Sequence, residues 1–388
     1  MRSVTYLPNN DVKLLETGLA LFPAMLAAIA GAQYEIYFET YIFADDETGR
    51  KVEQALIEAA LRGVRVRVVT DWWGTGDKQC TRLGIAFAQA GVRYRVFNRW
   101  FKRGVSRTHR KITLVDREVA FVGGININDD WFCDYDCTRR LPAPRWDFAV
   151  EVRGPLVAPI LHEVQAQWAR VGHLGLIKRI GLFREMHLER PHRSVGDKPM
   201  VAGFVVRDSL RNRRTIQSAY LHAIGRAKKS VLLVNPYFAP GHKFRRALAL
   251  AAQRGVEVKL LIGVGEILLQ DMVARSFYPK LLASGVRVYE YRKTQLHAKV
   301  AVVDDDWATV GSSNCDGLSL FLNQEANVVV KDAQFAATMR ERILHGIADG
   351  VEICSEDFAN VGWIRRTGYG TAYFVYRMVM RVFAIGYA

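Results

Sequence analysis

Cysteine is scarce in this chain of 388 residues: it occurs five times, an odd number. Such a set forms no obvious disulfide framework, and we expect all five to be reduced thiols of an intracellular chain. Cys133 and Cys137 lie close together in an aromatic and acidic stretch, but no second pair completes a zinc site. Most histidines also lack ligand spacing, which predicts surface or structural roles for His162, His173, His187, His192, His222, His242 and His345.

The sequence shows no secretory signal and, near its start, no apolar run that could span a bilayer. Residues 17–32 are uncharged and rich in alanine, but a spanning helix needs about 20 apolar residues. Pro23 stands where we expect this helix to begin, since proline suits the first helical turn. We therefore expect a helix of a soluble domain here.

Acidic residues are outnumbered by basic ones, 39 against 54, which gives a net charge of +15. This excess favours an anionic partner, either nucleic acid, an anionic lipid or a phosphorylated substrate. Half of the residues are hydrophobic, so a chain of this length can bury two sizeable cores.

One short pattern, His-x-Lys-x4-Asp, occurs twice. Its residues are His109, Lys111 and Asp116 in the first copy, and His297, Lys299 and Asp304 in the second. Seven residues after each aspartate begins a small turn that ends in asparagine, at Asn126 and at Asn314. Two copies with the same downstream turn make accident an unlikely explanation.

The spacing of the pattern predicts an anion site. Residues 112–115 and 300–303 are unbroken β-branched and apolar runs, which are typical of buried strands. Alternation along a strand places the histidine and the lysine of each copy on one face. A glycine-rich turn allows close approach of the backbone, and its asparagine supplies amide donors. Imidazole, ammonium and amide pointing into one space suit phosphate above all.

The rest of the chain repeats as well. Residues 24–32 match residues 219–227 at their apolar positions, and each segment leads into a strand-like run with an aromatic end, at 39–43 and at 235–238. We therefore expect a duplicated α/β unit, each half a mixed or mostly parallel sheet flanked by helices, with one active site at their interface. The predicted organisation is an N-terminal half at 1–180, a linker at 181–203, a C-terminal half at 204–350 and a C-terminal segment at 351–388.

The C-terminal segment has a different character. Residues 372–385 are almost entirely apolar or aromatic, with Arg377 and Arg381 one helical turn apart. We favour an amphipathic segment at a membrane surface, with arginine and aromatic side chains at headgroup level. The alternative is a last helix packed on the domain, with both arginines on its solvent face.

A basic run with interleaved aromatic residues, 93–110, precedes the first motif, and the second half has a shorter connection there. We interpret it as a contact for lipid headgroups, although a charge run is often only a solvated face. Aromatic residues in predicted loops could help to exclude water, with core packing as the alternative for about half of them: Tyr41, Trp72, Trp73, Trp100, Phe101, Trp131, Phe132 and Tyr237. Asp71 follows a strand and could line the same cleft or simply serve a turn.

The duplicated motif resembles that of the phospholipase D superfamily, and within it the bacterial cardiolipin synthases of the short type without N-terminal transmembrane helices. The resemblance runs from about Leu14 to Asp332. It is carried by the segments 38–43, 109–126 and 297–314, and the run 318–327 extends the second motif as in such synthases.

The resemblance implies a phosphatidyl transfer through a phosphohistidine, with glycerol released and with phosphatidylglycerol as the acceptor and the expected donor. One histidine attacks phosphorus, for which analogy favours His109, and the other transfers protons. The two motif lysines, Asn126 and Asn314 would hold the non-bridging oxygens. In this family the aspartates that correspond to Asp116 and Asp304 are taken to support a histidine. Their position at the far ends of the strands suggests instead that each orients the site of the other half or a nearby segment of backbone.

Further site residues follow from the same resemblance and alignment of the halves. We expect Asp147 and Glu325 to orient the histidines, and we assign to substrate binding the set Glu39, Tyr41, Asn235, Tyr237, Asp147 and Glu325. Because the two lysines supply the positive charge that a metal ion would otherwise supply, no metal or cofactor is expected. The expected location is peripheral, on the cytoplasmic side of the bacterial inner membrane, and nucleic acid is not an expected partner.

Three other functions fit parts of the sequence. A nuclease of the same superfamily would use the positive charge on a DNA backbone. A phospholipase D would hydrolyse the lipid and release phosphatidic acid. A catalytically silent membrane adaptor is the third, although intact His, Lys, Asp and Asn in both copies argue against it.

Overall fold

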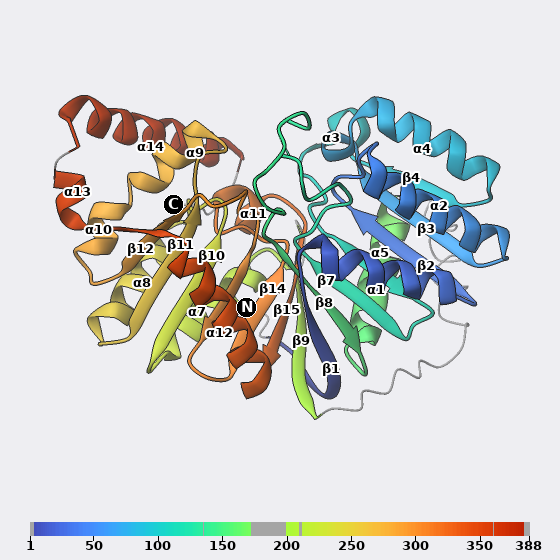
Figure 1. The fold of residues 1–388 in the computed structure, drawn as a ribbon, viewed down its shortest axis with the longest axis horizontal. Coiled ribbons are helices and arrows are strands. Elements are labelled where there is room, and N and C mark those ends of the chain that lie inside the picture. Colours follow the sequence, from blue (N-terminus) through green and yellow to red (C-terminus); the bar gives the residue numbers. More distant parts are fainter. Residues whose placement is uncertain (1–3, 135, 172–198, 209–211, 360, 384–388) are drawn as a thin grey trace. The chain divides into compact units, whose positions relative to one another are not determined.

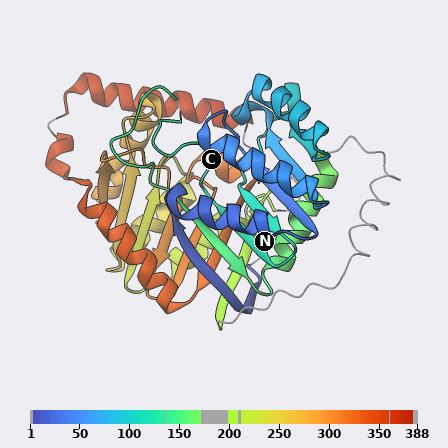
Figure 2. The ribbon, with the colours of Figure 1, turned by 45° about the vertical axis from the view of Figure 1, so that its right-hand side comes forward.

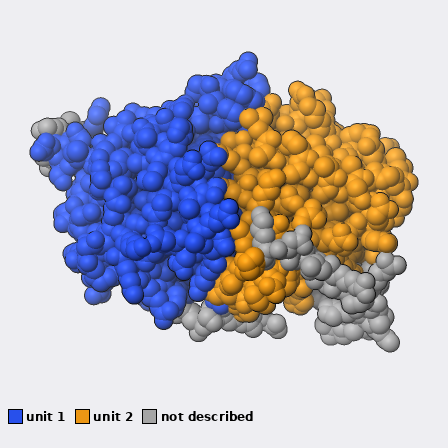
Figure 3. Space-filling model, turned by 60° about the horizontal axis from the view of Figure 1, so that its bottom comes forward, with its two compact units in different colours: residues 1–4, 130–148, 205–388 blue, residues 5–129, 149–204 orange. Residues whose placement is uncertain are grey.

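The structure, a computed structural model, describes residues 4–383 apart from 135, 172–198, 209–211 and 360. Two compact units make up the chain (Figure 3). The N-terminal unit comprises Thr5–Asp129 and Ala149–Phe204, and the C-terminal unit comprises Asp130–Phe148 and Val205–Ala388, with Met1–Val4. The segment 130–148 therefore belongs to the C-terminal unit, whereas the sequence analysis placed it in the N-terminal half.

The N-terminal unit is built on a mixed sheet with the strand order β9-β1-β8-β7-β6-β2-β3-β4 (Figure 1). Its strands are β1 (Tyr6–Glu16), β2 (Glu35–Thr40), β3 (Arg65–Asp71), β4 (Arg93–Phe97), β6 (Ile112–Val115), β7 (Val119–Gly123), β8 (Phe148–Arg153) and β9 (Met200–Arg207). Strands β2, β3 and β4 run parallel, while β6, β7 and β8 form an antiparallel meander that joins β2 through β6. Strands β2, β6 and β7 are buried throughout, and burial on both faces explains the continuous apolar runs of β6 and β7.

Helices cover this sheet and fill its core. They are α1 (Thr17–Gly31), α2 (Glu47–Leu61), α3 (Trp72–Thr75), α4 (Asp77–Gln89) and α5 (Val157–Val171), with the short elements η1 (Arg99–Phe101) and β5 (Lys102–Val105). Residues of α1 at helical spacing, Leu21, Met25 and Ile29, pack into the core. We expected α1 to begin near Pro23, but it begins at Thr17, so the proline lies inside the helix. Burial of this apolar stripe compensates for the hydrogen bond that proline removes.

The C-terminal unit repeats this sheet. Its strand order is β16-β12-β11-β10-β13-β14-β15. The strands are β10 (Ser230–Asn235), β11 (Glu257–Gly263), β12 (Arg287–Tyr291), β13 (Val300–Val303), β14 (Trp307–Gly311), β15 (Glu325–Lys331) and β16 (Val351–Ile353). Three parallel strands, β10 to β12, are again followed by the antiparallel meander β13 to β15, which pairs with β10. The expected duplicated α/β architecture is confirmed in the topology of each unit.

The helices of the C-terminal unit are α7 (Thr215–Arg226), α8 (His242–Gln253), α9 (Leu268–Arg275), α10 (Tyr278–Leu282), α11 (Gly317–Phe321), α12 (Ala333–Ala348), α13 (Ser355–Ala359) and α14 (Trp363–Phe383). Most of the predicted linker, 181–203, lies outside the described residues. Its last residues already belong to β9, which pairs antiparallel with β1.

The C-terminal segment forms α14, which packs along α9 (Figures 1 and 2). Met380 is fully buried against Leu318, Phe321 and Tyr376, so one face of the helix is part of the unit. Another face exposes apolar side chains: Trp363, Phe374, Val375, Met378 and Val379. Packing on the domain, the alternative interpretation, therefore describes one face of the helix, whereas the membrane-surface interpretation of the exposed face stays a prediction. Within the described ranges, no helix combines the length and the apolar character needed to cross a membrane.

Candidate functional site

The first motif places its histidine and lysine together just before β6. His109 and Lys111 are both buried, and the ring of Tyr41 lies edge-on to the imidazole at 4.8 Å between centroids. The Lys111 ammonium donates to the carbonyl of His109 at 2.9 Å and lies 5.2 Å from the centroid of the Tyr41 ring. The hydroxyl of Tyr41 in turn accepts a hydrogen bond from Arg107 at 3.2 Å. The structure thus brings together three of the residues that the sequence analysis selected.

A buried ion-pair network holds the backbone on both sides of His109. Arg110 forms a fork with Glu39, at 3.1 and 2.8 Å, and also donates to Glu163 at 2.8 Å. Thr108 donates its hydroxyl to the same Glu39 carboxylate. The carboxylate of Glu39 thus neutralises Arg110, and its assignment to substrate binding stays a prediction. Its role is to position the chain next to His109.

Asp71 anchors the same stretch from β3. Its carboxylate accepts the backbone N–H of Trp73 and Gly74 at the start of α3, at 2.9 and 3.1 Å, and that of Thr108 at 2.8 Å. Burial raises the pKa of Asp71 to about 6, although these hydrogen bonds oppose the shift. Of the two roles considered for Asp71, the turn role is the one these contacts support.

The second motif has a carboxylate directly behind its histidine. Nδ1 of His297 lies 2.6 Å from Oδ2 of Asp147, and because an ionised carboxylate only accepts, the imidazole donates. Lys299 donates to the carbonyl of His297 and lies 3.5 Å from the same oxygen of Asp147. Burial of Lys299 lowers its pKa to about 8, even though the negative charge of Asp147 acts in the opposite direction. The arrangement joins a carboxylate, an imidazole and a readily deprotonated ammonium.

Asp147 reaches His297 because its segment runs parallel to the chain before the second motif. Trp146 donates its N–H to the carbonyl of Gln295, and His297 donates its N–H to the carbonyl of Trp146, both at 2.9 Å. The other oxygen of Asp147 accepts the N–H of Phe148 at 2.8 Å, which fixes the plane of the carboxylate. Asp147 therefore contacts a histidine, which supports the expected orienting role, and its assignment to substrate binding stays a prediction.

Sequence reasoning missed the polar network that holds this segment in place. The buried guanidinium of Arg145 contacts Asp130 at 3.5 Å, Asp134 at 3.2 Å and the side chain of Gln295 at 3.2 Å. Asp134 also approaches Nε2 of His297 at 4.0 Å. No periodicity or motif marks these residues, since their partners are distant in sequence.

The motif aspartates lie far from their histidines. Seven residues of nearly extended chain correspond to about 20 Å, so Asp116 is at the opposite end of β6 from His109. Its carboxylate accepts three consecutive backbone N–H groups before and at the start of β2, those of residues 33–35, at 2.6 to 2.8 Å. Asp304 accepts those of residues 228–230 in the same way, at 2.7 to 3.1 Å.

These contacts support a structural role for the two aspartates, and a catalytic role for either one stays a prediction. Both adopt the left-handed backbone conformation, with φ of 51° and 50°, in the turns after β6 and β13. Aspartate tolerates this conformation better than most residues. The motif thus needs an aspartate both for its turn and for its carboxylate, and the nearby-backbone alternative of the sequence analysis is the one observed.

The turn that ends in Asn314 is fixed by short contacts to β15. A side chain at Gly311 would bring its Cβ within 2.3 Å of Cγ of Asn327, so only glycine fits there. Ser312 donates to the carboxylate of Glu325 at 2.6 Å and accepts the N–H of Ala326 at 3.0 Å. Glu325, which we had assigned to orienting a histidine and binding substrate, contributes here by holding this turn.

The two turn asparagines share an unusual feature. Oδ1 of Asn126 and Oδ1 of Asn314 are both buried without a hydrogen-bond partner in the described structure. Asn235, at the end of β10, uses its own Oδ1 to accept the N–H of Cys315 at 3.0 Å, while its Nδ2 is similarly unpaired within the described residues. Tyr237 follows it and is partly exposed. Buried amide atoms without partners are rare and are typical of positions that receive a ligand.

Comparison with known proteins identifies a family and several relatives of this chain. The family described as "Cardiolipin synthase, PLD-like domain" matches residues 25–137 and 220–345, which contain the two motifs. Cardiolipin synthase B of Salmonella typhi is 39% identical over 342 residues, covering 86% of this chain and 80% of the relative. Cardiolipin synthase B of Escherichia coli K12 is 38% identical over 347 residues, covering 87% and 80%.

Solved structures agree on the fold. Phosphatidylserine synthase of Haemophilus influenzae superposes with a TM-score of 0.69 at 12% sequence identity, covering 98% of this chain and 96% of that one. The sequence similarity and the duplicated fold together show that the chain belongs to the phospholipase D superfamily, in its cardiolipin synthase family with PLD-like domains.

Proposed function

We propose that this chain is a cardiolipin synthase, which transfers the phosphatidyl group of one phospholipid, phosphatidylglycerol, to a hydroxyl of a second phosphatidylglycerol. The observation that carries the proposal is the Asp147–His297–Lys299 arrangement, with a 2.6 Å hydrogen bond from the imidazole to the carboxylate. A carboxylate behind an imidazole fixes its tautomer and stabilises the imidazolium. This suits a histidine that transfers protons, and the names of the similar proteins supply the substrate class.

In the proposed reaction, Nε2 of His109 attacks the donor phosphorus, and a P–N bond forms as the P–O bond to glycerol breaks. His297 gives a proton to the departing glycerol oxygen. It then takes the proton of the acceptor hydroxyl, whose oxygen attacks phosphorus and breaks the P–N bond. The balance is one diester exchanged for another, with glycerol released and both histidines restored.

The remaining residues of the motifs have an electrostatic role in this proposal. Lys111 and Lys299 neutralise the non-bridging oxygens, whose charge is concentrated in the transition state. Asn126 and Asn314, whose buried Oδ1 atoms have no partner among the described residues, supply further hydrogen bonds, since rotation of an amide can present its NH₂ to the phosphate. Tyr41 covers His109 and helps to keep water from the intermediate.

The test is a product analysis of the purified protein on phosphatidylglycerol vesicles, with glycerol and acyl groups labelled separately. Cardiolipin together with free glycerol is the expected result, and His109→Ala or His297→Ala should abolish it. The matched control is His222→Ala, an exposed histidine on α7. Phosphatidic acid as the main product would instead establish a hydrolase, and cleavage of DNA alone would establish a nuclease.

We also propose that the protein acts peripherally on the cytoplasmic side of the bacterial inner membrane. In the C-terminal unit, α9 and α14 form an apolar ridge of exposed side chains: Leu268, Leu269, Phe374, Val375, Met378 and Val379. Leu268 is 74% exposed and Phe374 is 63% exposed, and several large apolar side chains exposed on two contacting helices are typical of an interaction surface. Arg377 and Arg381 are exposed on the same helix and suit anionic headgroups.

Vesicle sedimentation tests this apolar ridge. Phe374→Ser with Met378→Ser should weaken binding to phosphatidylglycerol vesicles by at least about tenfold, because each buried side chain contributes about 1.5 to 3 kcal/mol. Leu344→Ser, which removes an exposed leucine from α12, is the matched control. Unchanged binding of the double variant would exclude the ridge as a membrane contact.

The N-terminal unit offers a second surface for the same purpose. Trp73, Trp100 and Phe101 are exposed and pack on one another and on Trp72 at centroid distances of 5.1 to 5.4 Å. Trp100 and Phe101 have φ of 57° and 52°, a conformation that non-glycine residues rarely adopt. Since a strained loop here presents aromatic rings to solvent, we assign it to the lipid interface. Trp100→Ser should reduce vesicle binding, whereas Ile85→Ser on α4 should not.

A further inference from the structure

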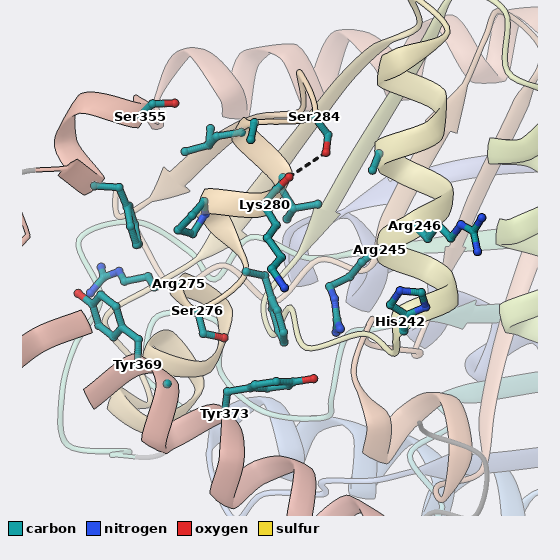
Figure 4. A pocket seen from close by; sticks show the side chains of 18 of the residues that line it. His242, Arg245, Arg246, Arg275, Ser276, Lys280, Ser284, Ser355, Tyr369 and Tyr373 are labelled. Atoms are coloured by element: carbon teal, nitrogen blue, oxygen red, sulfur yellow. Dashed lines mark hydrogen bonds between the residues drawn. The ribbon is translucent and has the colours of Figure 1, made fainter. Parts of the chain in front are cut away.

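We propose that the C-terminal unit carries a second anion site, a cavity that takes the phosphate group of a phospholipid headgroup or of a soluble phosphate ester. The cavity has a volume of about 1140 Å³ and lies among α8, α9, α10, α13 and α14 (Figure 4). Neither His297, Lys299 nor Asn314 lines it. The inference goes beyond the proposed transferase activity and does not depend on it.

The lining of the cavity is strongly positive. Among its residues is Arg275, whose charge is neutralised by a fork to Glu290 at 2.7 and 2.9 Å. Four more cations line it and have no carboxylate partner in the part of the chain that the structure describes: Arg245, Arg246, Lys280 and Arg377. No aspartate or glutamate is among the described lining residues. Uncompensated charges that converge on a concave surface attract an anion.

Two of these cations are arranged as a clamp. In Figure 4, Arg245 from α8 and Lys280 from α10 extend toward the same space. Arg245 stacks over Phe277, 4.2 Å from the ring centroid, and donates to the carbonyl of Pro240, so its guanidinium is held in place. A guanidinium and an ammonium that extend toward one space are a combination suited to phosphate oxygens.

The cavity is also too large and too aromatic for a bare inorganic anion. Phe277, Phe358, Tyr369 and Tyr373 contribute rings to its lining, which would pack against the carbon atoms of a phosphate ester. Tyr373 is followed directly by Phe374 and Val375 of the exposed apolar ridge. A phospholipid with its headgroup in the cavity could therefore lay its acyl chains along α14, and this favours the lipid over the soluble ester.

Two binding measurements on the full chain distinguish the sources. Glycerol 3-phosphate is titrated by calorimetry, and phosphatidylcholine vesicles with or without phosphatidic acid are used in sedimentation. Binding only to the phosphatidic acid vesicles assigns the site to a lipid headgroup, and binding only to glycerol 3-phosphate assigns it to a soluble ester. Both sources are supported if both probes bind, whereas no binding of either probe would overturn the proposal.

The variants show whether the cavity is responsible. Lys280→Ala with Arg245→Gln should raise the Kd of the bound probe about tenfold, since two charge-assisted contacts are lost. Lys243→Ala with Arg226→Gln removes the same charge from exposed positions of α8 and α7 that do not line the cavity, and should change the Kd less than about twofold.

An equal loss in both double variants would show only general attraction by the net charge and would sink the proposal. Should the first double variant fail to fold, Lys280→Ala alone decides, because Lys280 is an exposed residue. If the wild-type protein binds a probe in this cavity but transfers no phosphatidyl group, the proposed function is contradicted and the second site is still supported.

Discussion

The carboxylate of Asp147 accepts the Nδ1 hydrogen of His297 at 2.6 Å, across 150 residues of sequence. The contact lies within one compact unit, because the segment 130–148 leaves the N-terminal half and joins the unit that contains the second motif. It sets the tautomer of His297, so that Nε2 is the nitrogen available to a reacting group. The hydrogen-bond partner that sets the tautomer of this histidine is therefore a residue outside the motif.

Asp147→Asn tests this preparation. The amide keeps the shape of the carboxylate but cannot stabilise the imidazolium, so we expect kcat to fall by about 10²- to 10⁴-fold with little change in KM. Steady-state kinetics on phosphatidylglycerol measure both constants. Glu151→Gln, a partly exposed carboxylate on β8, is the control and should retain activity. A kcat for Asp147→Asn within threefold of the wild type would refute the role of the pair.

The pH dependence of activity should follow Lys299. Its pKa is lowered to about 8 by burial, so raising the pH through this value converts the cation that holds phosphate into a neutral amine. We expect kcat/KM, which reports the free enzyme, to fall above about pH 8 with the loss of one proton. An activity that is constant up to pH 10 would contradict this prediction.

The same titration can be assigned with the Asp147→Asn variant. The negative charge of Asp147 raises the pKa of Lys299, so its removal should move the alkaline limb of the remaining activity to lower pH. The Glu151→Gln variant should leave the limb where it is. A limb that moves to higher pH in Asp147→Asn would have the wrong sign for Lys299.

The sequence predicts those parts of the fold that depend on local pattern. The strands β6 and β13 coincide with the runs 112–115 and 300–303 that flank the two lysines, because continuous apolar and β-branched residues specify a buried strand. The repeat predicts that the two units have the same topology. The start of α1 was misplaced because proline was read as a helix start, while the buried stripe Leu21, Met25 and Ile29 outweighs its local effect.

The sequence predicts only those residues of the site that belong to the two motifs and to the turns that follow them. The histidines, lysines and asparagines of the two motifs are recognisable from their spacing. The partner of a carboxylate is not, because it is set by contacts between residues that are far apart in the sequence. The resemblance and the alignment of the halves assign Glu39 to substrate binding, but its fork with Arg110 spans 71 residues and follows from neither. Asp116 was grouped with catalysis because it belongs to the motif, although its contacts hold the backbone before β2.

Asp304→Ala should destabilise the C-terminal unit rather than act on chemistry alone. The substitution leaves the N–H groups of residues 228–230 without their acceptor, and we expect a loss of about 2 to 4 kcal/mol in the free energy of unfolding. Urea unfolding measures it. Its neighbour Asp305 pairs with Lys229 at the surface, so Asp305→Ala should cost less than about 1 kcal/mol. Equal effects of the two substitutions would refute the backbone role of Asp304.

Arg110→Met alone should destabilise the protein more than the same substitution combined with Glu39→Gln. It leaves Glu39 buried with a negative charge and no cation, which typically costs about 3 to 5 kcal/mol. Glu39→Gln together with Arg110→Met removes both charges, and we expect this double variant to recover at least half of the lost stability in urea unfolding. Recovery of stability without recovery of phosphatidyl transfer would show that the ion pair also sets the position of His109. A double variant no more stable than Arg110→Met would mean that the charge of Glu39 is not the cause of the loss.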